Sequence, residues 1–286
     1  MSRIAYVNGR YLPLSQAVVH IEDRGYQFAD GVYEVLALVN GRLLDQKRHF
    51  ERLLRSLDAL SIDLPVSLGA LPLILEQLIR RNRLRHGLLY IQITRGVSRR
   101  EHAFPAAAAS SLVMTLRHNR PTPSAVLNEG ARVISIPDIR WHRCDIKSIS
   151  LLPNILGKQA AKAAGAYEAW MINKEGFVTE GTSTNAWIID KSGTLLTHPA
   201  NHSILNGITR MAVIDLARSL ALKLDERAFS LAEALAASEA FLTSTTGYVL
   251  PVTKIDGHAV GDGRPGPLTL RLRQAYETAM IGASHA

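Results

Sequence analysis

The chain has 286 residues, of which 47% are hydrophobic, and it carries a formal net charge of +8 at pH 7. This length allows one large domain or two moderate ones with a sizeable buried core. No apolar run approaches the ~20 residues that span a bilayer, and the first residues lack the apolar segment of a signal peptide. The single cysteine, Cys144, excludes an intramolecular disulfide framework. These features predict a cytoplasmic protein with no membrane partner.

The basic charge raises nucleic-acid binding as an alternative to catalysis. The densest arginine groups are 80–85 and 99–100, and neither is interleaved with the aromatic residues that single-strand binders use. A basic run by itself is a weak sign of nucleic-acid binding. We therefore favour solvated surfaces and an anionic small ligand, and we expect no nucleic-acid partner. A basic binding protein without catalysis stays as the alternative from a different class.

The N-terminal part is predicted to form an antiparallel sheet with helices. Asn8-Gly9 and Asn40-Gly41 each separate two β-prone runs, which is the strongest short signal for a hairpin. Leucines at helical spacing follow. In chain order we expect strands 4–7, 10–12, 33–39 and 42–44, helices 50–60 and 68–79, and strands 88–94 and 112–116. A polar loop, 95–110, separates the last two strands.

A linker is predicted where two prolines, Pro121 and Pro123, lie in a stretch without periodicity. We expect a small N-terminal domain at 1–118, a linker at 119–126 and a large C-terminal domain at 127–286. The elements expected in the large domain are strand 132–136, helix 155–164, a hairpin around 173–176, helix 208–222 and helix 268–280. Strands and helices come in runs, which favours an α+β architecture with two domains.

The segment from Cys144 to Asn185 holds the residues that best suit a pyridoxal phosphate enzyme. Lys147 is surrounded by apolar neighbours, and a desolvated lysine is a good nucleophile and base; the alternative is an ordinary surface lysine. Glu180 ends a predicted strand, and a carboxylate beside a pyridine nitrogen keeps that nitrogen protonated; the alternative is a turn residue.

Two stretches offer donors for a phosphate group. Residues 206–210 stand at the predicted start of a helix, where free backbone N–H groups and the helix dipole favour an anion. Residues 243–247 supply hydroxyl groups and a glycine. Either stretch could equally be a helix cap or a turn. Arg52 adds a permanent positive charge that suits a phosphate.

Two other motifs are incomplete. Lys158 resembles the end of a phosphate-binding P-loop, but Leu152 stands where that motif needs a glycine. His198 and His202 have a spacing typical of metal ligands on a helix, but Pro199 argues against a helix there. The sequence thus predicts no metal site.

Together these residues resemble a known family, the fold-type-IV pyridoxal-phosphate enzymes of the branched-chain aminotransferase superfamily. Within it, the chain is most similar to the D-amino-acid (D-alanine) aminotransferases. The resemblance covers nearly the whole chain, in order and spacing. Its motifs are Glu22-Asp23-Arg24-Gly25-Tyr26-Gln27-Phe28-Ala29-Asp30-Gly31-Val32-Tyr33-Glu34-Val35, His49-Phe50-Glu51-Arg52-Leu53, Thr94-Arg95-Gly96, Lys147-Ser148, Glu180-Gly181-Thr182-Ser183-Thr184-Asn185, Leu205-Asn206-Gly207-Ile208-Thr209-Arg210 and Ser244-Thr245-Thr246.

The resemblance implies the site residues one by one. Lys147 would be the catalytic lysine that forms a Schiff base with pyridoxal 5'-phosphate, and Glu180 would bind the ring nitrogen. Leu205 would pack against the ring. The other cofactor-binding residues it implies are Arg52, Ile208, Thr209 and Thr245 at the phosphate, with Ser183 and Ser244 in the surrounding hydrogen-bond shell.

The resemblance also implies the substrate. In D-amino-acid aminotransferases a tyrosine and an Arg-x-His pair bind the substrate carboxylate, and this chain has Tyr33, Arg100 and His102. In that family the Arg-x-His loop reaches the neighbouring active site, which implies a homodimer. Two departures from the family pattern, Ala29 in place of glycine and Tyr248 in place of a smaller or acidic residue, concern the substrate preference and not the type of reaction.

The reaction implied is a ping-pong transamination between a D-amino acid and a 2-oxo acid such as 2-oxoglutarate or pyruvate. The same resemblance leaves relatives of the same fold open. They are an aminotransferase for branched-chain L-amino acids, an aminotransferase for (R)-amines, and aminodeoxychorismate lyase.

Overall fold

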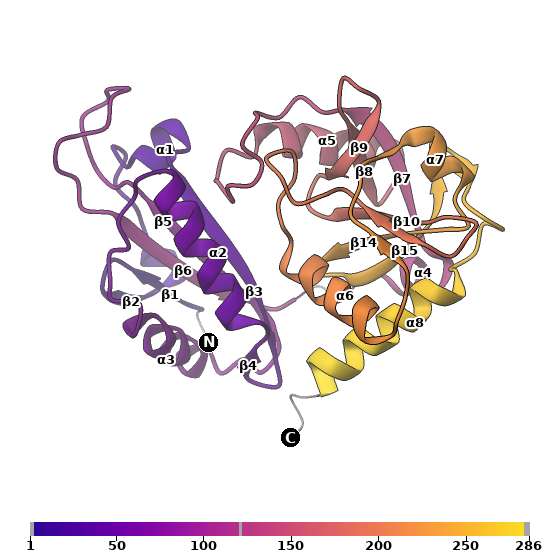
Figure 1. Cartoon of the computed structure of the whole chain (residues 1–286). Helices are drawn as coiled ribbons and strands as arrows, with labels where there is room; N and C mark the ends of the chain where they lie inside the picture. Colours follow the sequence, from indigo (N-terminus) through magenta and orange to yellow (C-terminus); the bar gives the residue numbers. More distant parts are fainter. Residues whose placement is uncertain (1–2, 120–121, 283–286) are drawn as a thin grey trace. The chain divides into compact units, whose positions relative to one another are not determined.

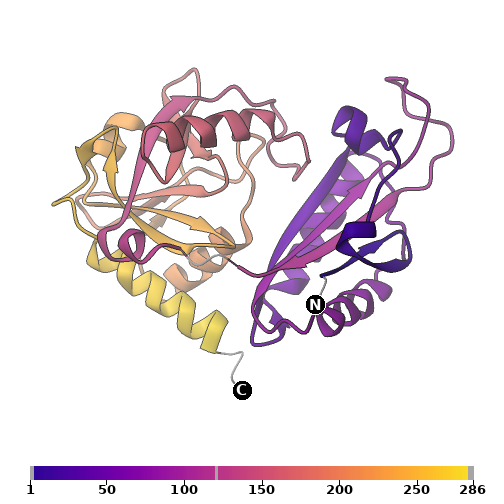
Figure 2. The same ribbon diagram turned by 180° about the vertical axis from the view of Figure 1, so that it is seen from behind.

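A computed structural model describes residues 3–119 and 122–282, which form two compact units (Figures 1 and 2). The first unit comprises the described residues up to 119 together with the short segment Ile146–Ser150. The second comprises residues 122–145 and 151–282. Each unit has its own sheet; the first has one hydrophobic core and the second has two.

The sheet of the first unit is wholly antiparallel among the described residues, with strand order β2-β1-β6-β5-β3-β4. Its strands are β1 (Ile4–Val7), β2 (Arg10–Pro13), β3 (Gly31–Val39), β4 (Arg42–Leu43), β5 (Gly87–Thr94) and β6 (Ser111–Arg117). Both predicted hairpins are confirmed. Asn8 and Asn40 have φ of 45° and 51°, and the glycine after each also has a positive φ, as a tight two-residue turn requires.

Two helices, α2 (Gln46–Ala59) and α3 (Ala70–Asn82), cover this sheet (Figure 1). Leu53 and Leu57 of α2 are one turn apart and both buried, so the helix presents an apolar stripe to β3. Leu71, Leu75 and Leu78 form a buried apolar stripe on α3, which faces β1 and β6. The leucine periodicity therefore predicted both helices correctly, within a few residues at their ends.

The sheet of the second unit is mixed, with strand order β12-β11-β10-β14-β15-β7-β8-β9-β13, and β16 pairs with β15. Parallel pairs join β7 to β8, β7 to β15 and β11 to β12. Its strands are β7 (Ala131–Pro137), β8 (Glu168–Ile172), β9 (Phe177–Gly181), β10 (Asn185–Ile189), β11 (Leu195–Thr197), β12 (Leu224–Asp225), β13 (Phe229–Ser230), β14 (Glu239–Ser244), β15 (Tyr248–Ile255) and β16 (His258–Ala259).

Aromatic pairs fill the two cores of this unit. Trp170 meets Phe229 edge to face in one core, and Trp187 stacks on Phe241 in the other at 5.2 Å between ring centroids. The helices around the sheet are α4 (Ser124–Glu129), α5 (Leu152–Ala163), α6 (Ile208–Ser219), α7 (Leu231–Ala236) and α8 (Pro267–Tyr276), which runs into a π-helical turn, Glu277–Ile281. The predicted α+β architecture is confirmed.

The predicted domain limits differ from these units in two places. The proposed linker 119–126 includes residues 120–121, which lie outside the described residues, and α4 already begins at Ser124. Lys147 was expected in the C-terminal domain, but its segment groups with the first unit because Val32 of β3 forms a β-bridge with Ser148.

Candidate active site

Lys147 lies on the segment that the first unit takes from the second half of the sequence. The backbone N–H of Tyr33 donates to the Lys147 carbonyl at 3.0 Å, and the Lys147 N–H donates to Ser56 Oγ at 3.2 Å. The Lys147 ammonium group stands 4.2 Å from the centroid of the Tyr33 ring, a cation–π contact. The structure therefore brings together two of the predicted site residues, Lys147 and Tyr33.

Arg52 belongs to a buried cluster that the sequence prediction did not include. Its Nε donates to Glu34 Oε1 at 2.7 Å and its Nη2 to Glu34 Oε2 at 2.8 Å, while His49 Nδ1 lies 2.6 Å from Glu34 Oε2. Burial alone would raise the pKa of Glu34, but Arg52 and His49 lower it to about 2. Burial lowers the pKa of His49. The cluster fixes the orientation of the Arg52 guanidinium.

Arg100 and His102 lie in the loop between β5 and β6, beside the short helix α1 (Arg24–Phe28) (Figure 1). Arg100 Cζ is 5.1 Å from the centroid of the Phe28 ring, and the His102 ring is 5.5 Å from it. Both side chains belong to exposed residues. The predicted pair is thus gathered around one aromatic ring.

The second unit holds Glu180 at the end of β9. Asn185 Nδ2 donates to its Oε2 at 3.0 Å, the Leu205 N–H lies 3.2 Å from both carboxylate oxygens, and Arg140 Nη1 donates to Oε1. Burial raises the pKa of Glu180, although Arg140 opposes that rise. The structure therefore fixes this buried carboxylate from three sides and places Leu205 against it.

Arg140 is a residue that the sequence prediction missed. Its guanidinium also binds Asp138 through Nε at 2.9 Å and Nη2 at 2.7 Å, and donates to the Ser203 carbonyl at 3.0 Å. Burial alone would raise the pKa of Asp138, but Arg140 lowers it below its usual range. A lone arginine in a segment without periodicity gives no signal in the sequence; only its buried partners identify it.

Helix α6 starts at Ile208, and its first turn fits an anion. Ile208 and Thr209 are both buried, and no side chain caps the helix at Gly207. A Cβ atom at Gly207 would stand 2.1 Å from Asn185 Oδ1, so only glycine fits there. Because N–H groups of a first helical turn have no intrahelical partner, this end suits a phosphate.

Ser183 and its neighbours converge on a buried acid, Glu168. The hydroxyl of Ser183 donates to Glu168 Oε2 at 3.1 Å, that of Thr184 lies 3.4 Å from the same oxygen, and that of Thr182 donates to Oε1. Glu168 therefore holds the turn that follows Glu180. The sequence prediction named Ser183 but missed Glu168.

Ser244 is the last residue of β14, and Thr245 begins the turn that leads to β15. Ser244 Oγ accepts from the Gly247 N–H at 3.0 Å and lies 3.4 Å from Thr246 Oγ1. Thr245 is half-buried. Next to this turn, Tyr248 has a φ of 56°, and Ala29 has one of 55°, so both departures from the family pattern are in left-handed backbone that disfavours a Cβ.

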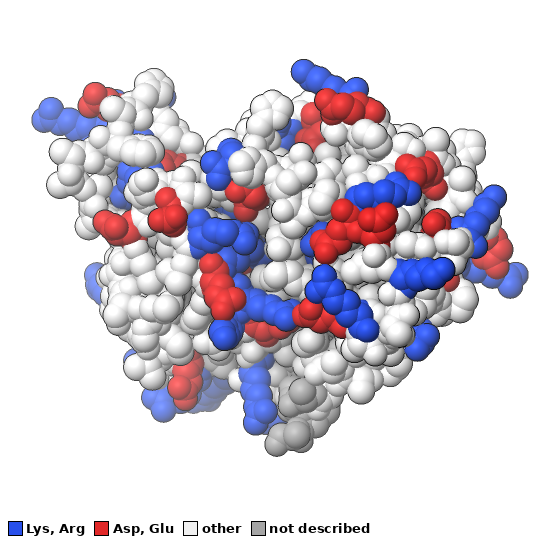
Figure 3. All heavy atoms as spheres, viewed as in Figure 1, with Lys and Arg blue, Asp and Glu red and all other residues white. Residues whose placement is uncertain are grey.

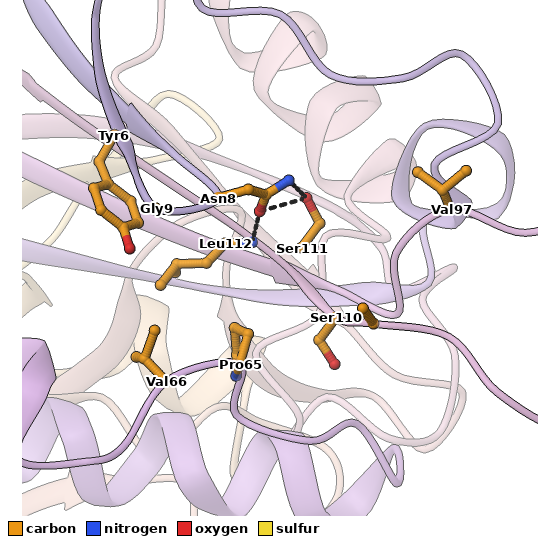
Figure 4. Close-up of a pocket in the computed structure, with 10 residues that line it drawn as sticks. Tyr6, Asn8, Gly9, Pro65, Val66, Val97, Ser110, Ser111 and Leu112 are labelled. Carbon is orange, nitrogen blue, oxygen red and sulfur yellow. Dashed lines mark hydrogen bonds between the residues drawn. The ribbon is translucent and has the colours of Figure 1, made fainter.

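The first unit also has a separate pocket that does not hold the predicted residues (Figure 4). Asn8 and Ser111 bind each other on its wall, and Asn8 Oδ1 accepts from the Leu112 N–H at 2.7 Å. Tyr6, Pro65 and Val66 line it as well. Since its lining offers no charged side chain, we assign it no role in the chemistry.

Within 3–119 and 122–282, no helix is long and apolar enough to span a membrane, and no group of three or more His, Cys, Asp or Glu residues could hold a metal ion. On the face drawn in Figure 3, Lys and Arg side chains alternate with Asp and Glu side chains. That face therefore offers no continuous basic surface to a nucleic acid.

Comparison with known proteins identifies the family. Residues 31–255 match the family described as amino-transferase class IV, a range that includes Tyr33, Arg52, Lys147 and Glu180. The chain belongs to the class IV aminotransferases. This aminotransferase is 43% identical to the D-alanine aminotransferase of Bacillus licheniformis, over 96% of each chain.

Solved structures show the same fold for this class IV aminotransferase. A branched-chain aminotransferase from Thermoproteus uzoniensis with norvaline is 28% identical, with a TM-score of 0.86, over 99% of this chain and 96% of that one. The branched-chain aminotransferase of Escherichia coli is 24% identical, with a TM-score of 0.91, over 99% and 96%. At 24% identity the second likeness shows the fold alone.

Proposed function

We propose that this class IV aminotransferase moves amino groups between D-amino acids and 2-oxo acids in a ping-pong cycle, with pyridoxal phosphate as cofactor. The observation that carries the proposal is the 43% identity to a D-alanine aminotransferase over 96% of both chains. The residues of each unit fit this chemistry. Bound pyridoxal phosphate supplies an electron-withdrawing ring that makes the Cα proton of an amino acid removable.

Lys147 is assigned the role of the base that removes and returns the Cα proton. Hydrogen bonds to Tyr33 and Ser56 hold its backbone, so the side chain that carries the amine extends from a fixed point. The Tyr33 ring at 4.2 Å from that amine limits where it can swing. A base must be oriented before its proton affinity matters, and these contacts support that orientation.

Glu180 is proposed to interact with the ring nitrogen of the cofactor, and its carboxylate would keep that nitrogen protonated. Arg140, Asn185 and the Leu205 N–H anchor the carboxylate, so it need not reorganise when charge develops. Ile208 and Thr209 at the start of α6, together with Thr245, are proposed to bind the phosphate group, and Ser183 and Ser244 to belong to the surrounding hydrogen-bond shell. Arg52 is also proposed to bind the phosphate group, because its charge suits a phosphate and Glu34 orients it.

Arg100, His102 and Tyr33 are proposed to bind the carboxylate of the substrate. The gathering of the Arg100 and His102 side chains around Phe28 supports a shared task. The loop residues Val97 and Phe104 remain 47% and 61% exposed in the single chain, which supports a homodimer in which this loop serves the neighbouring subunit.

Half-reactions test the proposal. The purified protein with pyridoxal phosphate should show the visible absorption band of the bound cofactor, and D-alanine should convert that band. Lys147→Ala should lose both the band and the activity while its circular dichroism spectrum stays native. If the protein binds no cofactor, the proposed catalytic function is contradicted, and the alternative of a basic binding protein without catalysis is favoured.

A second candidate function rests on the 28% identity to a branched-chain aminotransferase. L-leucine and (R)-1-phenylethylamine, offered in the same half-reaction, separate the candidates. Conversion of L-leucine without D-alanine would replace the D-amino-acid assignment by the branched-chain one, and pyruvate release from aminodeoxychorismate would point to the lyase.

A further inference from the structure

Arg24 holds the loop that carries Arg100 and His102. Its side chain is 3% exposed and its Nε donates to Asp30 Oδ2 at 2.8 Å. Its other donors reach three successive backbone carbonyls of the loop: Nη1 lies 2.6 Å from Glu101 O and 3.3 Å from Ala103 O, and Nη2 lies 3.4 Å from His102 O. One buried guanidinium thus binds both Asp30, which directly precedes β3, and the loop backbone at residues 101–103.

The second arginine of this cluster, Arg95, contacts the loop at Phe104. Arg95 also binds Asp30, through Nε at 2.8 Å and Nη2 at 3.0 Å, and donates to the carbonyls of Leu60 and Ser61. Its Cζ lies 3.6 Å from the centroid of the Phe104 ring. Asp30 therefore fixes two guanidinium groups, and both bear on the loop from its buried face.

The Arg24 contacts go to backbone atoms, whereas the loop side chains stay exposed. Arg24 also lies 4.9 Å from the Phe28 ring, the same ring that Arg100 and His102 flank. Without this support the loop would have to be ordered each time a ligand binds, which weakens binding.

We propose that Arg24 is a positioning residue: it holds the backbone of residues 101–103 so that Arg100 and His102 are oriented for a substrate carboxylate. This inference rests on the proposed function for its kinetic consequence, but the loop restraint itself does not. Lysine cannot replace Arg24, because a single ammonium group cannot reach Asp30 and three carbonyls in the geometry of the planar fork.

The kinetic test compares Arg24→Lys and Arg24→Gln with Arg117→Gln, an exposed arginine on β6 of the same unit. Both Arg24 variants should raise the KM for D-alanine about tenfold, about 1.4 kcal/mol of binding free energy, with kcat changed less than about twofold. The dissociation constant of pyridoxal phosphate should stay that of the wild type, because the proposed function gives this loop no contact with the cofactor, and Arg117→Gln should match the wild type in both measurements. An unchanged KM for D-alanine, or an equal weakening of cofactor binding, would overturn the inference.

A double variant tests whether Arg24 acts through Arg100. If it does, Arg24→Lys combined with Arg100→Ala should show the KM of Arg100→Ala alone, because residues of one network are not additive. If the KM increases of the two single variants multiply in the double variant, Arg24 does not act through Arg100.

Trypsin supplies a readout that needs no substrate. Arg99 and Arg100 are exposed cleavage sites on the loop. In the holoenzyme, Arg24→Gln and Arg24→Lys should be cut there several times faster than the wild type and Arg117→Gln, while thermal unfolding checks that Arg24→Lys is folded. Equal cleavage rates would refute the restraint. Failure of the wild type to react with D-alanine would instead refute the proposed function and leave the trypsin result to decide the restraint.

Discussion

Arg52 and Glu34 form a two-pronged ion pair inside the first unit, with N–O distances of 2.7 and 2.8 Å and side-chain exposures of 5% and 0%. Glu34 lies on β3 and Arg52 on α2, so the pair ties the helix to the sheet as well as orienting a proposed phosphate ligand. Breaking such a pair removes the opposite charge that compensates a buried ion.

Glu34→Gln should therefore lower the free energy of unfolding by about 3–5 kcal/mol, measured by urea denaturation. The control is Glu51→Gln on the same helix. Glu51 is 61% exposed and 4.0 Å from Lys47, so its replacement should cost less than about 0.5 kcal/mol. Equal effects of the two variants would mean that burial does not decide the strength of these pairs.

The same carboxyl makes stability depend on acid. The pKa of Glu34 is about 2 in the folded protein against 4.5 ordinarily, so the unfolded chain binds the proton more readily between these values. The contribution is present above about pH 4.5 and is lost as the pH falls toward 2. It amounts to roughly 3 kcal/mol.

Urea denaturation at a series of pH values checks this. The wild type should lose stability between pH 4.5 and 2 more steeply than Glu34→Gln, which lacks the titrating carboxyl. Parallel pH profiles for the two proteins would contradict the assignment of the low pKa to Glu34.

Arg140 and Arg143 offer a matched comparison in the second unit. Arg140 is 5% exposed and binds Asp138 and Glu180, whereas Arg143 is 40% exposed and binds Asp145. Arg140→Gln should raise the pKa of Glu180 further, because burial already raises it and the opposing charge is removed.

A higher pKa increases the protonated fraction of Glu180 at a given pH, and this weakens its proposed interaction with the ring nitrogen of the cofactor. Arg140→Gln should raise the dissociation constant of pyridoxal phosphate at least about tenfold, about 1.4 kcal/mol, when the cofactor absorption is titrated. Arg143→Gln should bind as the wild type does. A normal affinity in Arg140→Gln would argue that Glu180 keeps its charge without this partner.

Gly207 is the position where a single methyl group should matter most. Its added Cβ would stand 2.1 Å from Asn185 Oδ1, and Asn185 is one of the groups that hold Glu180. Gly207→Ala should destabilise the protein by about 1–3 kcal/mol and weaken cofactor binding, as thermal unfolding and absorption titration would measure.

Gly69→Ala serves as its control. A Cβ there meets nothing within 4 Å, and φ is −69°, so the change should leave both stability and cofactor binding near those of the wild type. If Gly207→Ala behaves like Gly69→Ala, the prediction is wrong, because Asn185 then moves aside without a loss of stability or of cofactor binding.

Local signals in the sequence determined the regular parts of this protein. The Asn-Gly pairs specified two hairpins because both residues tolerate positive φ, and leucines one turn apart specified α2 and α3 because a helix buries one face. The order of motifs from Glu22 to Thr246 indicated the family, which residues 31–255 confirm.

Tertiary structure alone decided how the candidate residues are supported. Glu34 holds Arg52, Arg140 holds Glu180, and Arg24 holds the loop of Arg100, yet each partner is far from its target in the sequence, and no local pattern indicates the pairing. The pairing of the Lys147 segment with β3 was also decided by the tertiary structure. A backbone hydrogen bond between distant segments does not depend on the side chains, so the composition does not predict it. Buried charges must be paired or pay the full loss of hydration, and only folding determines which charges meet.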